Sequence, residues 1–498
     1  MSSVPTPAQA YRFGGPEHKG VLVGLRLPQV VVLAAAVIAA VAVLIAVPSA
    51  TGLGLAFALV ATGAPAAVAR VRGRRLDEWA PVVARWAALV VLGRRQWRSS
   101  LPQLGLTPAT EWAEPPPPLA GVALLRARRP GTTTATAVVR DARARSYVAV
   151  VACRTKPFAL LDADEQNRLA AQWGQALAGV AQEGSPVTRI AWVERTLPGD
   201  ADALAAHLED HATLGPSHRA HASYAQLVAD AGPATQLHEC FVVVSVGGKR
   251  ARQAIAKAGG GDRGGAEVVL REVSALADRL RQADIDVDEV LEPRRLAAVL
   301  RGAFDPRLVR PLAARARRHP ARAGAGGPSA WPLATNVAWD HYQADSGLHA
   351  TYWMAELPRH DVHAAFLYPL LLRTSAMRAV AVVAEPIAPS VAAREVEAAR
   401  ASHVADEELR AKAGYLPSAR RRRTHDDLAA REAELAAGHA EYRFSGYVTV
   451  SATDAEALEA GAGEVEHLGF DAGVELRRLY GEQDAAFTYT LPLARGLR

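Results

Sequence analysis

Cysteine, methionine and lysine are scarce in this sequence. Its 498 residues include 2 cysteines, 3 methionines and only 5 lysines, although lysine and arginine together number 57. Cys153 and Cys240 lack the CxxC spacing of metal-binding cysteines, which argues against a disulfide framework and against a cysteine-based metal site. Both lie in apolar runs typical of strands, so we expect buried thiols that pack as small apolar side chains.

Motifs of common nucleotide-binding and hydrolytic sites are also missing. The string Val246–Arg250 lacks the upstream glycine and the Ser or Thr that a P-loop needs. There is no HExxH or GxSxG motif, and the pairs His207/His211 and His218/His221 have no third ligand at a recognisable spacing. The sequence therefore predicts no catalytic, cofactor-binding or metal-binding residues, and a protein that is not an enzyme.

One glycine-rich stretch, 259–265, precedes a predicted helix. Backbone amides at the beginning of a helix can bind anions, which makes this stretch a candidate for such a site. A flexible loop is the favoured interpretation, because glycine has the greatest conformational freedom of all residues.

The formal charge of +6 is confined to one end of the chain. Residues 1–118 carry 11 basic and 5 acidic residues, whereas 119–498 carry 46 of each. A uniformly basic protein would favour nucleic acid as a partner. The local excess lies instead beside two apolar runs, where basic residues indicate the orientation of a membrane protein.

The two apolar runs, 27–47 and 53–71, follow a polar segment of residues 1–26. About 20 apolar helical residues span a bilayer, so the sequence predicts a transmembrane hairpin over 27–71. Basic residues flank both outer ends of this hairpin, and the connecting turn carries no charge. The positive-inside rule then predicts a multi-pass membrane protein with both termini in the cytoplasm.

The segment 76–98 mixes tryptophan, arginine and aliphatic residues. Tryptophan favours the headgroup depth of a bilayer and arginine attracts anionic lipid, so we expect an interfacial helix on the inner leaflet. A proline-rich linker over 99–118 ends this region. The residues expected to set its topology and depth are Arg70, Arg72, Arg74, Arg75, Trp79, Trp86, Arg94, Arg95, Trp97 and Arg98.

After the prolines, the hydrophobic pattern predicts alternating strands and helices. The order strand, strand, helix, strand, helical insert, strand, helix occurs twice, over 119–300 and 331–498. In the second copy the insert is a long charged segment, 390–438. The sequence therefore predicts an α+β fold with two tandem cytosolic modules, each an antiparallel sheet covered on one face by helices.

Two arginine-rich segments lie in this part of the chain. The basic linker 301–330 joins the two modules, and Arg420–Arg423 interrupt the insert. Both segments could contact DNA or anionic lipid. Solvated tethers are favoured, because acidic residues balance the total charge and no aromatic residues are interleaved to stack on bases. Direct DNA binding stays the less favoured alternative.

Short strings near the two ends resemble proteins of conjugation machines. Tyr11–Gly14 and Gly24–Gln29, which lead into the hairpin, are similar to the PrgI-type small inner-membrane subunit of Gram-positive conjugation systems. Two later parts of the chain resemble the N-terminal, non-ATPase domain of VirB-type conjugation ATPases. They are Ala430–His439 before Tyr447–Val450, and the late string Gln483–Leu493.

These resemblances imply a non-enzymatic inner-membrane scaffold of an actinobacterial conjugation or type IV secretion-like apparatus. The ATP-binding half of the VirB-type family has no counterpart in this sequence, so the implied partners are a separate cytoplasmic ATPase and other membrane subunits. EccE of type VII secretion is the alternative resemblance, because it also combines two N-terminal spans with a cytosolic α+β domain. A membrane-tethered enzyme is a further alternative, for which the sequence offers no convergent acidic or metal-binding residues.

Overall fold

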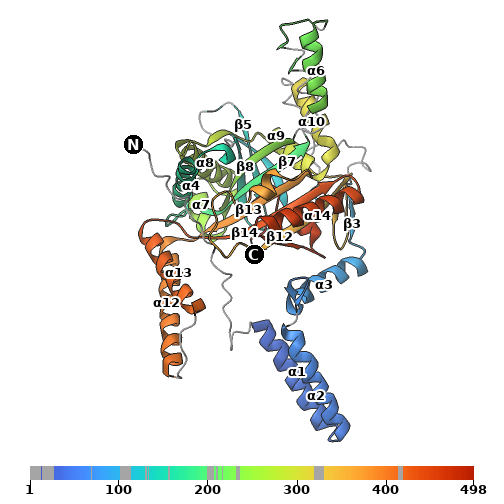
Figure 1. The fold of residues 1–498 in the computed structure, drawn as a ribbon, viewed down its shortest axis with the longest axis vertical. Coiled ribbons are helices and arrows are strands. Elements are labelled where there is room, and N and C mark those ends of the chain that lie inside the picture. Colours follow the sequence, from blue (N-terminus) through green and yellow to red (C-terminus); the bar gives the residue numbers. More distant parts are fainter. Residues whose placement is uncertain are drawn as a thin grey trace.

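The computed structural model describes most of the chain beyond its N-terminal segment (Figure 1). The described residues are 13, 27–68, 70–100, 114–128, 132, 134–154, 158–198, 207–208, 211–215, 217–231, 236–318, 330–412 and 419–497. The N-terminal region contains α1 (Leu27–Ala46), α2 (Ala50–Val68), β1 (Arg70–Val71), β2 (Arg74–Arg75), α3 (Leu76–Val91) and β3 (Gln96–Arg98).

The remaining elements fall into two halves. The first half contains β4 (Val122–Arg128), β5 (Ala135–Asp141), β6 (Ser146–Arg154), α4 (Ala163–Ala178), β7 (Val187–Pro198), α6 (Arg219–Ala231), β8 (Gln236–Gly247), α7 (Gly248–Lys257), α8 (Gly261–Gln282), β9 (Asp286–Val290) and α9 (Pro293–Phe304). After α10 (Val309–Arg318), the second half contains β10 (Ala334–Val337), β11 (Tyr342–Ala344), β12 (Gly347–Glu356), α11 (Tyr368–Leu372), β13 (Arg378–Pro386), α12 (Pro389–Lys412), α13 (Ala419–Ala436), β14 (Tyr442–Ala452), α14 (Ala455–Asp471), β15 (Glu475–Arg478) and α15 (Gln483–Phe487).

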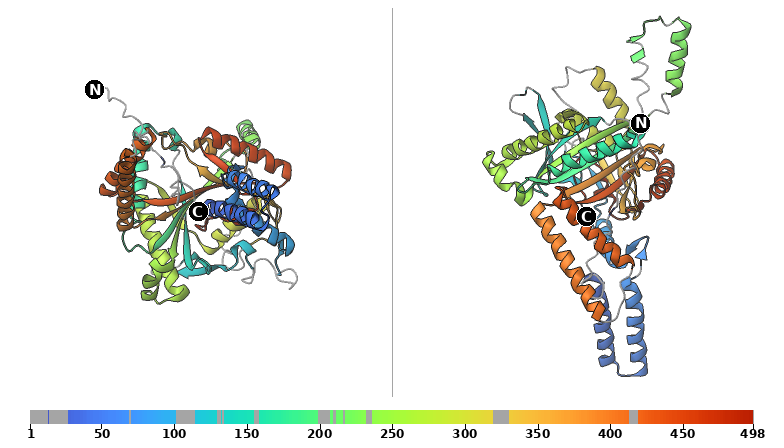
Figure 2. Two further views of the ribbon diagram at one scale, coloured as in Figure 1. Left: turned by 90° about the horizontal axis from the view of Figure 1, so that it is seen from below. Right: turned by 60° about the vertical axis from the view of Figure 1, so that its left-hand side comes forward.

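The helices α1 and α2 pack side by side as a hairpin at one end of the molecule (Figures 1 and 2). Within the described residues, no helix is at once long enough and apolar enough to cross a bilayer. The predicted transmembrane hairpin over 27–71 is therefore wrong on this finding, and so is the predicted multi-pass inner-membrane location with both termini in the cytoplasm.

The strands from β3 to β15 form one antiparallel sheet. Within the described residues its 13 strands follow the order β3-β10-β11-β12-β14-β13-β7-β8-β6-β5-β4, with β15 also pairing with β12 and β9 with β6. The two halves meet in the middle, where β7 pairs with β13 and Val193 lies opposite Ala381. The α+β class is confirmed, but one continuous sheet replaces the two that the sequence predicts. Pairing β7 with β13 leaves neither half with an open edge at this position.

Each half contains the same βαββαβ unit. In the first half β6, α4, β7, β8, α8 and β9 give the strand order β9-β6-β8-β7, and in the second half β12, α11, β13, β14, α14 and β15 give β15-β12-β14-β13. A pair of strands precedes each unit: β4 and β5 before β6, and β10 and β11 before β12. The module boundaries 119–300 and 331–498 stay a prediction.

Apolar side chains fill both faces of the sheet, because central strands such as β6 are apolar at almost every position. Val151 packs beneath α4 and α8, while its neighbour Val150 packs on the opposite face. Trp192 of β7 contacts both the core under α8 and the core under α14. The opposite face is covered by α9 and by the C-terminal segment with α15, where the rings of Phe304 and Phe487 lie 5.1 Å apart.

Helical segments project from two ends of the sheet (Figures 1 and 2). The connection from β7 to β8 contains α6, which extends from the end of the sheet where α10 lies. The helices α12 and α13, between β13 and β14, extend toward the same end of the molecule as α1 and α2. Because β7 and β13 are antiparallel, equivalent connections in the two halves leave in opposite directions. The N-terminal region joins the sheet through β3, where Trp97 lies opposite Thr335 of β10.

Candidate functional site

The tryptophans of α3 pack against the second half of the sheet. The ring of Trp79 stacks on Trp339 with 5.9 Å between centroids and 18° between planes, and Trp86 meets the same ring edge-on at 5.4 Å. The indole N–H of Trp79 donates to the carbonyl of Val71 at 3.0 Å. Val82 is buried on the same side of α3. The spacing i, i+3 and i+7 of Trp79, Val82 and Trp86 therefore forms the packed face of this helix.

Ion pairs hold α3 in the same place. Arg85 Nη2 lies 2.6 Å from Asp484 Oδ2, and Arg85 Nη1 donates to the carbonyl of Gly481 at 3.1 Å. The buried Arg74 Nη2 lies 3.1 Å from Glu482 Oε2. Partly buried pairs of this kind are screened less by salt than exposed ones. We refer to the contact of α3 with Trp339 and residues 481–484 as the α3 interface.

Glycine at position 481 permits the close approach of α3. Gly481 has a φ of 73°, in the left-handed region that favours glycine. A Cβ at this position would lie 2.7 Å from Trp339 Cζ3 and 2.8 Å from Val82 Cγ1. The N–H of Gly481 also donates to the carbonyl of Trp339 at 2.7 Å. A side chain here would force α3 away from the second half.

Two further predicted arginines lie over aromatic rings. The guanidinium carbon of Arg72 is 4.5 Å from the ring centroid of Tyr480, and that of Arg95 is 5.1 Å from the ring centroid of Trp86. Arg95 Nε also donates to the carbonyl of Val337 at 2.9 Å. Cation–π contacts add attraction between a guanidinium and a ring face. Both arginines thus contact the protein itself.

The remaining predicted residues have different surroundings. Arg70 lies opposite Arg75 in the β1–β2 ladder, and Arg98 lies opposite Ala334 beside the Trp97 pair. Arg94 is exposed. The structure thus brings Arg72, Arg74, Trp79, Trp86 and Arg95 together around the second half. A role in membrane topology or lipid contact stays a prediction for this segment.

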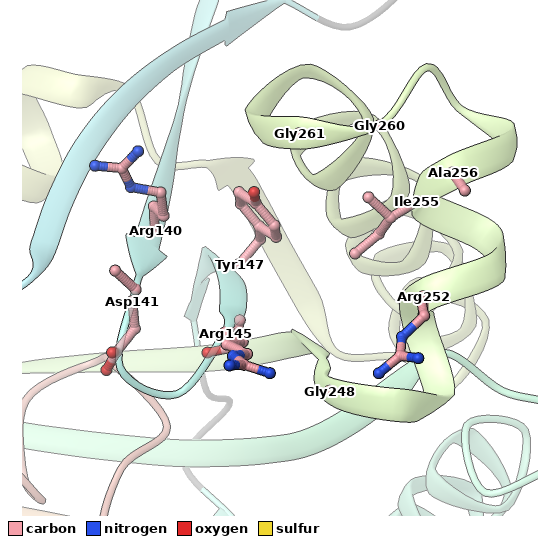
Figure 3. A pocket seen from close by; sticks show the side chains of 12 residues that line it. Arg140, Asp141, Arg145, Tyr147, Gly248, Arg252, Ile255, Ala256, Gly260 and Gly261 are labelled. Atoms are coloured by element: carbon pink, nitrogen blue, oxygen red, sulfur yellow. The ribbon is translucent and has the colours of Figure 1, made fainter.

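A second candidate site is a pocket of about 440 Å³ in the first half (Figure 3). It lies where the β5–β6 turn, the beginning of α7 and the turn from α7 to α8 meet. Tyr147 and Ile255 provide apolar walls, and Arg140, Arg145 and Arg252 bring guanidinium groups to the lining. The pocket is therefore cationic with an aromatic side.

The glycines of this pocket set the course of the backbone. Gly248, Gly260 and Gly261 have φ values of 61°, 70° and 55°, and a Cβ on any of them would meet nothing within 4 Å. Glycine is thus required here for the left-handed backbone and not for space. The stretch 259–265 forms a tight turn and the first turn of α8, where the sequence favoured a flexible loop.

The charges of the pocket are only partly compensated. Arg140 Nη1 lies 2.9 Å from Asp262 Oδ2, and the hydroxyl of Tyr147 donates to Asp262 Oδ1 at 2.9 Å. Burial, with this hydrogen bond, raises the pKa of Tyr147. Within the part of the chain that the structure describes, the guanidinium groups of Arg145 and Arg252 have no hydrogen-bond or ion-pair partner. Figure 3 shows both groups at the same end of the pocket.

The two cysteines lie opposite each other in β6 and β8, as free and buried thiols. Burial raises the pKa of Cys153 to about 12 and also raises that of Cys240. The indole N–H of Trp192 donates to Cys240 Sγ at 3.1 Å. Because the thiolate is the reactive form of cysteine, both groups are held unreactive, as the buried thiols expected from the sequence would be.

The other candidate residues form no shared site. The rings of His207 and His211 stack at 4.1 Å, and no group of three or more His, Cys, Asp or Glu residues is placed to hold a metal within the described ranges. Phe13, in the string that resembles the PrgI-type subunit, packs on Phe366 at 5.2 Å. The side chains of Arg420–Arg423 lie outside the described residues.

A protein-family model matches part of this chain. The family, described as a putative type VII ESX secretion system translocon, EccE, matches residues 234–354. This stretch runs from β8 to β12, and it includes Trp339 and the α7–α8 wall of the pocket. No match was found among curated proteins. The resemblances to PrgI-type subunits and VirB-type ATPases find no support in these comparisons, whereas the alternative resemblance to EccE is supported over 234–354.

Proposed function

We propose that this chain is a structural component of a type VII secretion translocon of the kind that the EccE family describes. The observation that carries this proposal is the family match over 234–354. The matched stretch includes β8, next to the central pair of strands, and β12, in the middle of the second unit. The similarity therefore concerns the segment that joins the two halves and not a peripheral loop.

The role we propose is to hold other components of the apparatus, without catalysis. Charged side chains in the middle of the sheet link neighbouring strands. Glu194 of β7 forms an ion pair with the buried Arg378 of β13, and its Oε1 lies 2.7 Å from His238 Nδ1 of β8. An uncompensated buried charge would cost about 3 to 5 kcal/mol. The buried charges are thus matched within the sheet, which supports a rigid platform.

The α1–α2 hairpin supplies a surface for a partner. Ile45 and Phe57 are 76% and 75% exposed, and Ile38 and Leu53 are also exposed. A continuous exposed apolar surface commonly marks an interaction site. We assign this surface to contact with another subunit of the translocon, because secretion apparatuses are built from several different chains.

The test is affinity purification of the tagged full-length protein from its native cells, followed by identification of the proteins that copurify. The expected result is recovery of other type VII translocon components. Recovery of a conjugation ATPase in their place, or of no secretion component, would contradict the proposal. Nucleotide turnover by the purified protein would contradict the non-enzymatic role.

A pair of matched variants distinguishes specific docking on the hairpin surface from nonspecific binding through exposed apolar side chains. Replacing both Ile45 and Phe57 by Ser is expected to reduce recovery of the partners. Leu160→Ser removes a side chain that is 83% exposed but lies outside the hairpin, and it should leave recovery unchanged. Equal losses in both variants would show that the hairpin is not the docking surface.

A further inference from the structure

The pocket between the β5–β6 turn and α7 has the dimensions of a small-molecule site. Its volume of about 440 Å³ lies within the range of roughly 300 to 1,000 Å³ typical of such sites. The ring of Tyr147 is fixed from two sides, by its hydrogen bond to Asp262 and by packing against Gly265, where a Cβ would lie 2.1 Å from the ring. The aromatic wall is therefore already in position before any ligand arrives.

The charge left over in the pocket is positive. Asp262 compensates Arg140, and Asp141 lies 3.6 Å from Arg495 while accepting a hydrogen bond from the N–H of Ala144 at 2.9 Å. Of the three arginines that line the pocket, Arg145 on the β5–β6 turn and Arg252 on α7 have no partner among the described residues. Guanidinium groups bind phosphate oxygens through paired, charge-assisted hydrogen bonds.

In the equivalent turn of the second half, the polar side chain finds its hydrogen-bond and ion-pair partners within the protein. Arg145 has a φ of 52° and Asp345, in the β11–β12 turn, has a φ of 48°. Asp345 accepts hydrogen bonds from the N–H groups of Leu333 and Ala334, both at 2.9 Å, and lies 2.5 Å from Arg301. Among the residues that the structure describes, the side chain of Arg145 has no such partner.

We propose that this pocket binds a soluble phosphorylated small molecule of nucleotide size. A phosphoryl group lies between Arg145 and Arg252, and the flat or apolar part of the molecule lies against Tyr147 and Ile255. The proposal does not rest on the proposed secretion role, because all of its contacts lie within the first half. A phosphorylated lipid headgroup has the same anionic chemistry, so the test includes it as a separate arm.

The experiment is calorimetric titration of the purified full-length protein at low ionic strength with ADP and with pyrophosphate. The protein is expected to bind both, and ADP more tightly because pyrophosphate cannot contact Tyr147 and Ile255. Arg145→Gly and Arg252→Gln should each weaken ADP binding by about tenfold or more, since each removes charge-assisted hydrogen bonds. Glycine suits the left-handed backbone at position 145, so Arg145→Gly should not lower the melting temperature.

The matched control is Arg143→Gln, which removes a cation from the same turn but outside the pocket lining. This variant should bind ADP within about twofold of the unaltered protein, because Arg143 does not line the pocket and so makes no direct hydrogen bond to a ligand there. Absence of binding by the unaltered protein, or an equal loss in the Arg143 variant, would overturn the proposal. Binding of phosphatidic acid vesicles through Arg145 and Arg252, without binding of ADP, would also overturn the assignment to a small molecule.

Discussion

The β5–β6 turn and the β11–β12 turn occupy equivalent places in the two halves of the sheet, but their polar side chains have different surroundings. In the second half, Asp345 lies beside the buried Arg301 of α9 and accepts two backbone hydrogen bonds. In the first half, Arg145 is exposed at the rim of the pocket. The same strand arrangement thus supports an internally satisfied turn in one half and an open cationic turn in the other.

The surrounding elements explain the difference. Between the halves, the chain continues from α9 into the second half, so α9 can supply Arg301 to Asp345 and the carbonyl of Phe304 to His349 at 3.1 Å. The β5–β6 turn faces the α7–α8 connection, whose glycines carry no side chains. A repeated backbone therefore does not imply repeated chemistry, since the segments added between the units decide which polar groups find partners.

Removing Asp345 should have the largest effect on the second half. Asp345→Ala removes the nearer carboxylate of Arg301, whose residue is only 8% exposed, and leaves only Asp305 Oδ2 at 3.9 Å. Breaking a buried pair from one side costs about 3 to 5 kcal/mol, and we expect a fall of this size in the free energy of unfolding, measured in urea. Asp345→Asn, which keeps an acceptor oxygen, should lose less. A loss below about 1 kcal/mol in the Ala variant would show that the turn is not held as described.

His349 should make the stability of the second half depend on pH. Burial lowers the pKa of His349 to about 4 from 6.5, and its neutral ring accepts from Ser451 Oγ at 2.9 Å while Nε2 donates to Phe304. Between these pKa values the unfolded chain binds the extra proton, so stability falls as the pH falls from about 6.5 to 4. The loss reaches about 3 kcal/mol at most.

The measurement is urea unfolding at pH 7 and at pH 4.5, with His349→Gln as the matched variant. Glutamine keeps hydrogen-bonding capacity without titrating, so the pH-dependent loss should be smaller in this variant. In the first half Val148 takes the equivalent register position, two residues beyond the pair that closes the turn. An identical pH dependence in both proteins would assign the effect to other groups.

The α3 interface is a contact of the second half, and adding a side chain at Gly481 tests it sterically. Gly481→Ala would place a Cβ within 2.8 Å of both Trp339 and Val82 at a φ of 73°, and we expect a loss of about 1 to 3 kcal/mol with a change in tryptophan fluorescence. Gly463→Ala on α14 is the control, because its Cβ would meet nothing within 4 Å. That variant should gain about 0.5 to 1 kcal/mol from better helix propensity. Unchanged fluorescence in Gly481→Ala would mean that α3 does not pack as described.

Part of this architecture could be predicted from local patterns. Runs such as Val148–Cys153 identify strands because nearly every residue is apolar, and the repeated order of strands and helices indicates the α+β class. The pairing of β7 with β13 has no local signal, because a strand buried on both faces can pair with many partners. The apolar runs 27–47 and 53–71 do lie largely in helices, but the prediction from composition that these helices span a membrane is wrong.

The candidate sites show the same limit. Trp79 and Trp86 stand out in the sequence, whereas their partner Trp339 lies in a short turn far along the chain without any motif around it. Arg145 and Arg252 come together only because β6 pairs with β8, which places Ser146 opposite Gly247. The local signals near the pocket are the glycine-rich stretch 259–265 and the string Val246–Arg250, since Gly248, Gly260 and Gly261 have left-handed backbones that favour glycine.

The smallest expected effect gives the sharpest contrast between the two turns, because one substitution should change stability in opposite directions. Arg145→Gly relieves a left-handed backbone at an exposed residue whose side chain has no partner in the described part of the chain. We expect a gain of about 0.5 kcal/mol in the free energy of unfolding without ligand. Asp345→Gly relieves a similar backbone but removes the contacts to Arg301, Leu333 and Ala334. Its free energy of unfolding should therefore fall by about 3 kcal/mol. Both values come from urea unfolding at pH 7 in the same buffer. Losses of equal size would mean that the β5–β6 turn is held internally too, and the open cationic turn would then have no physical basis.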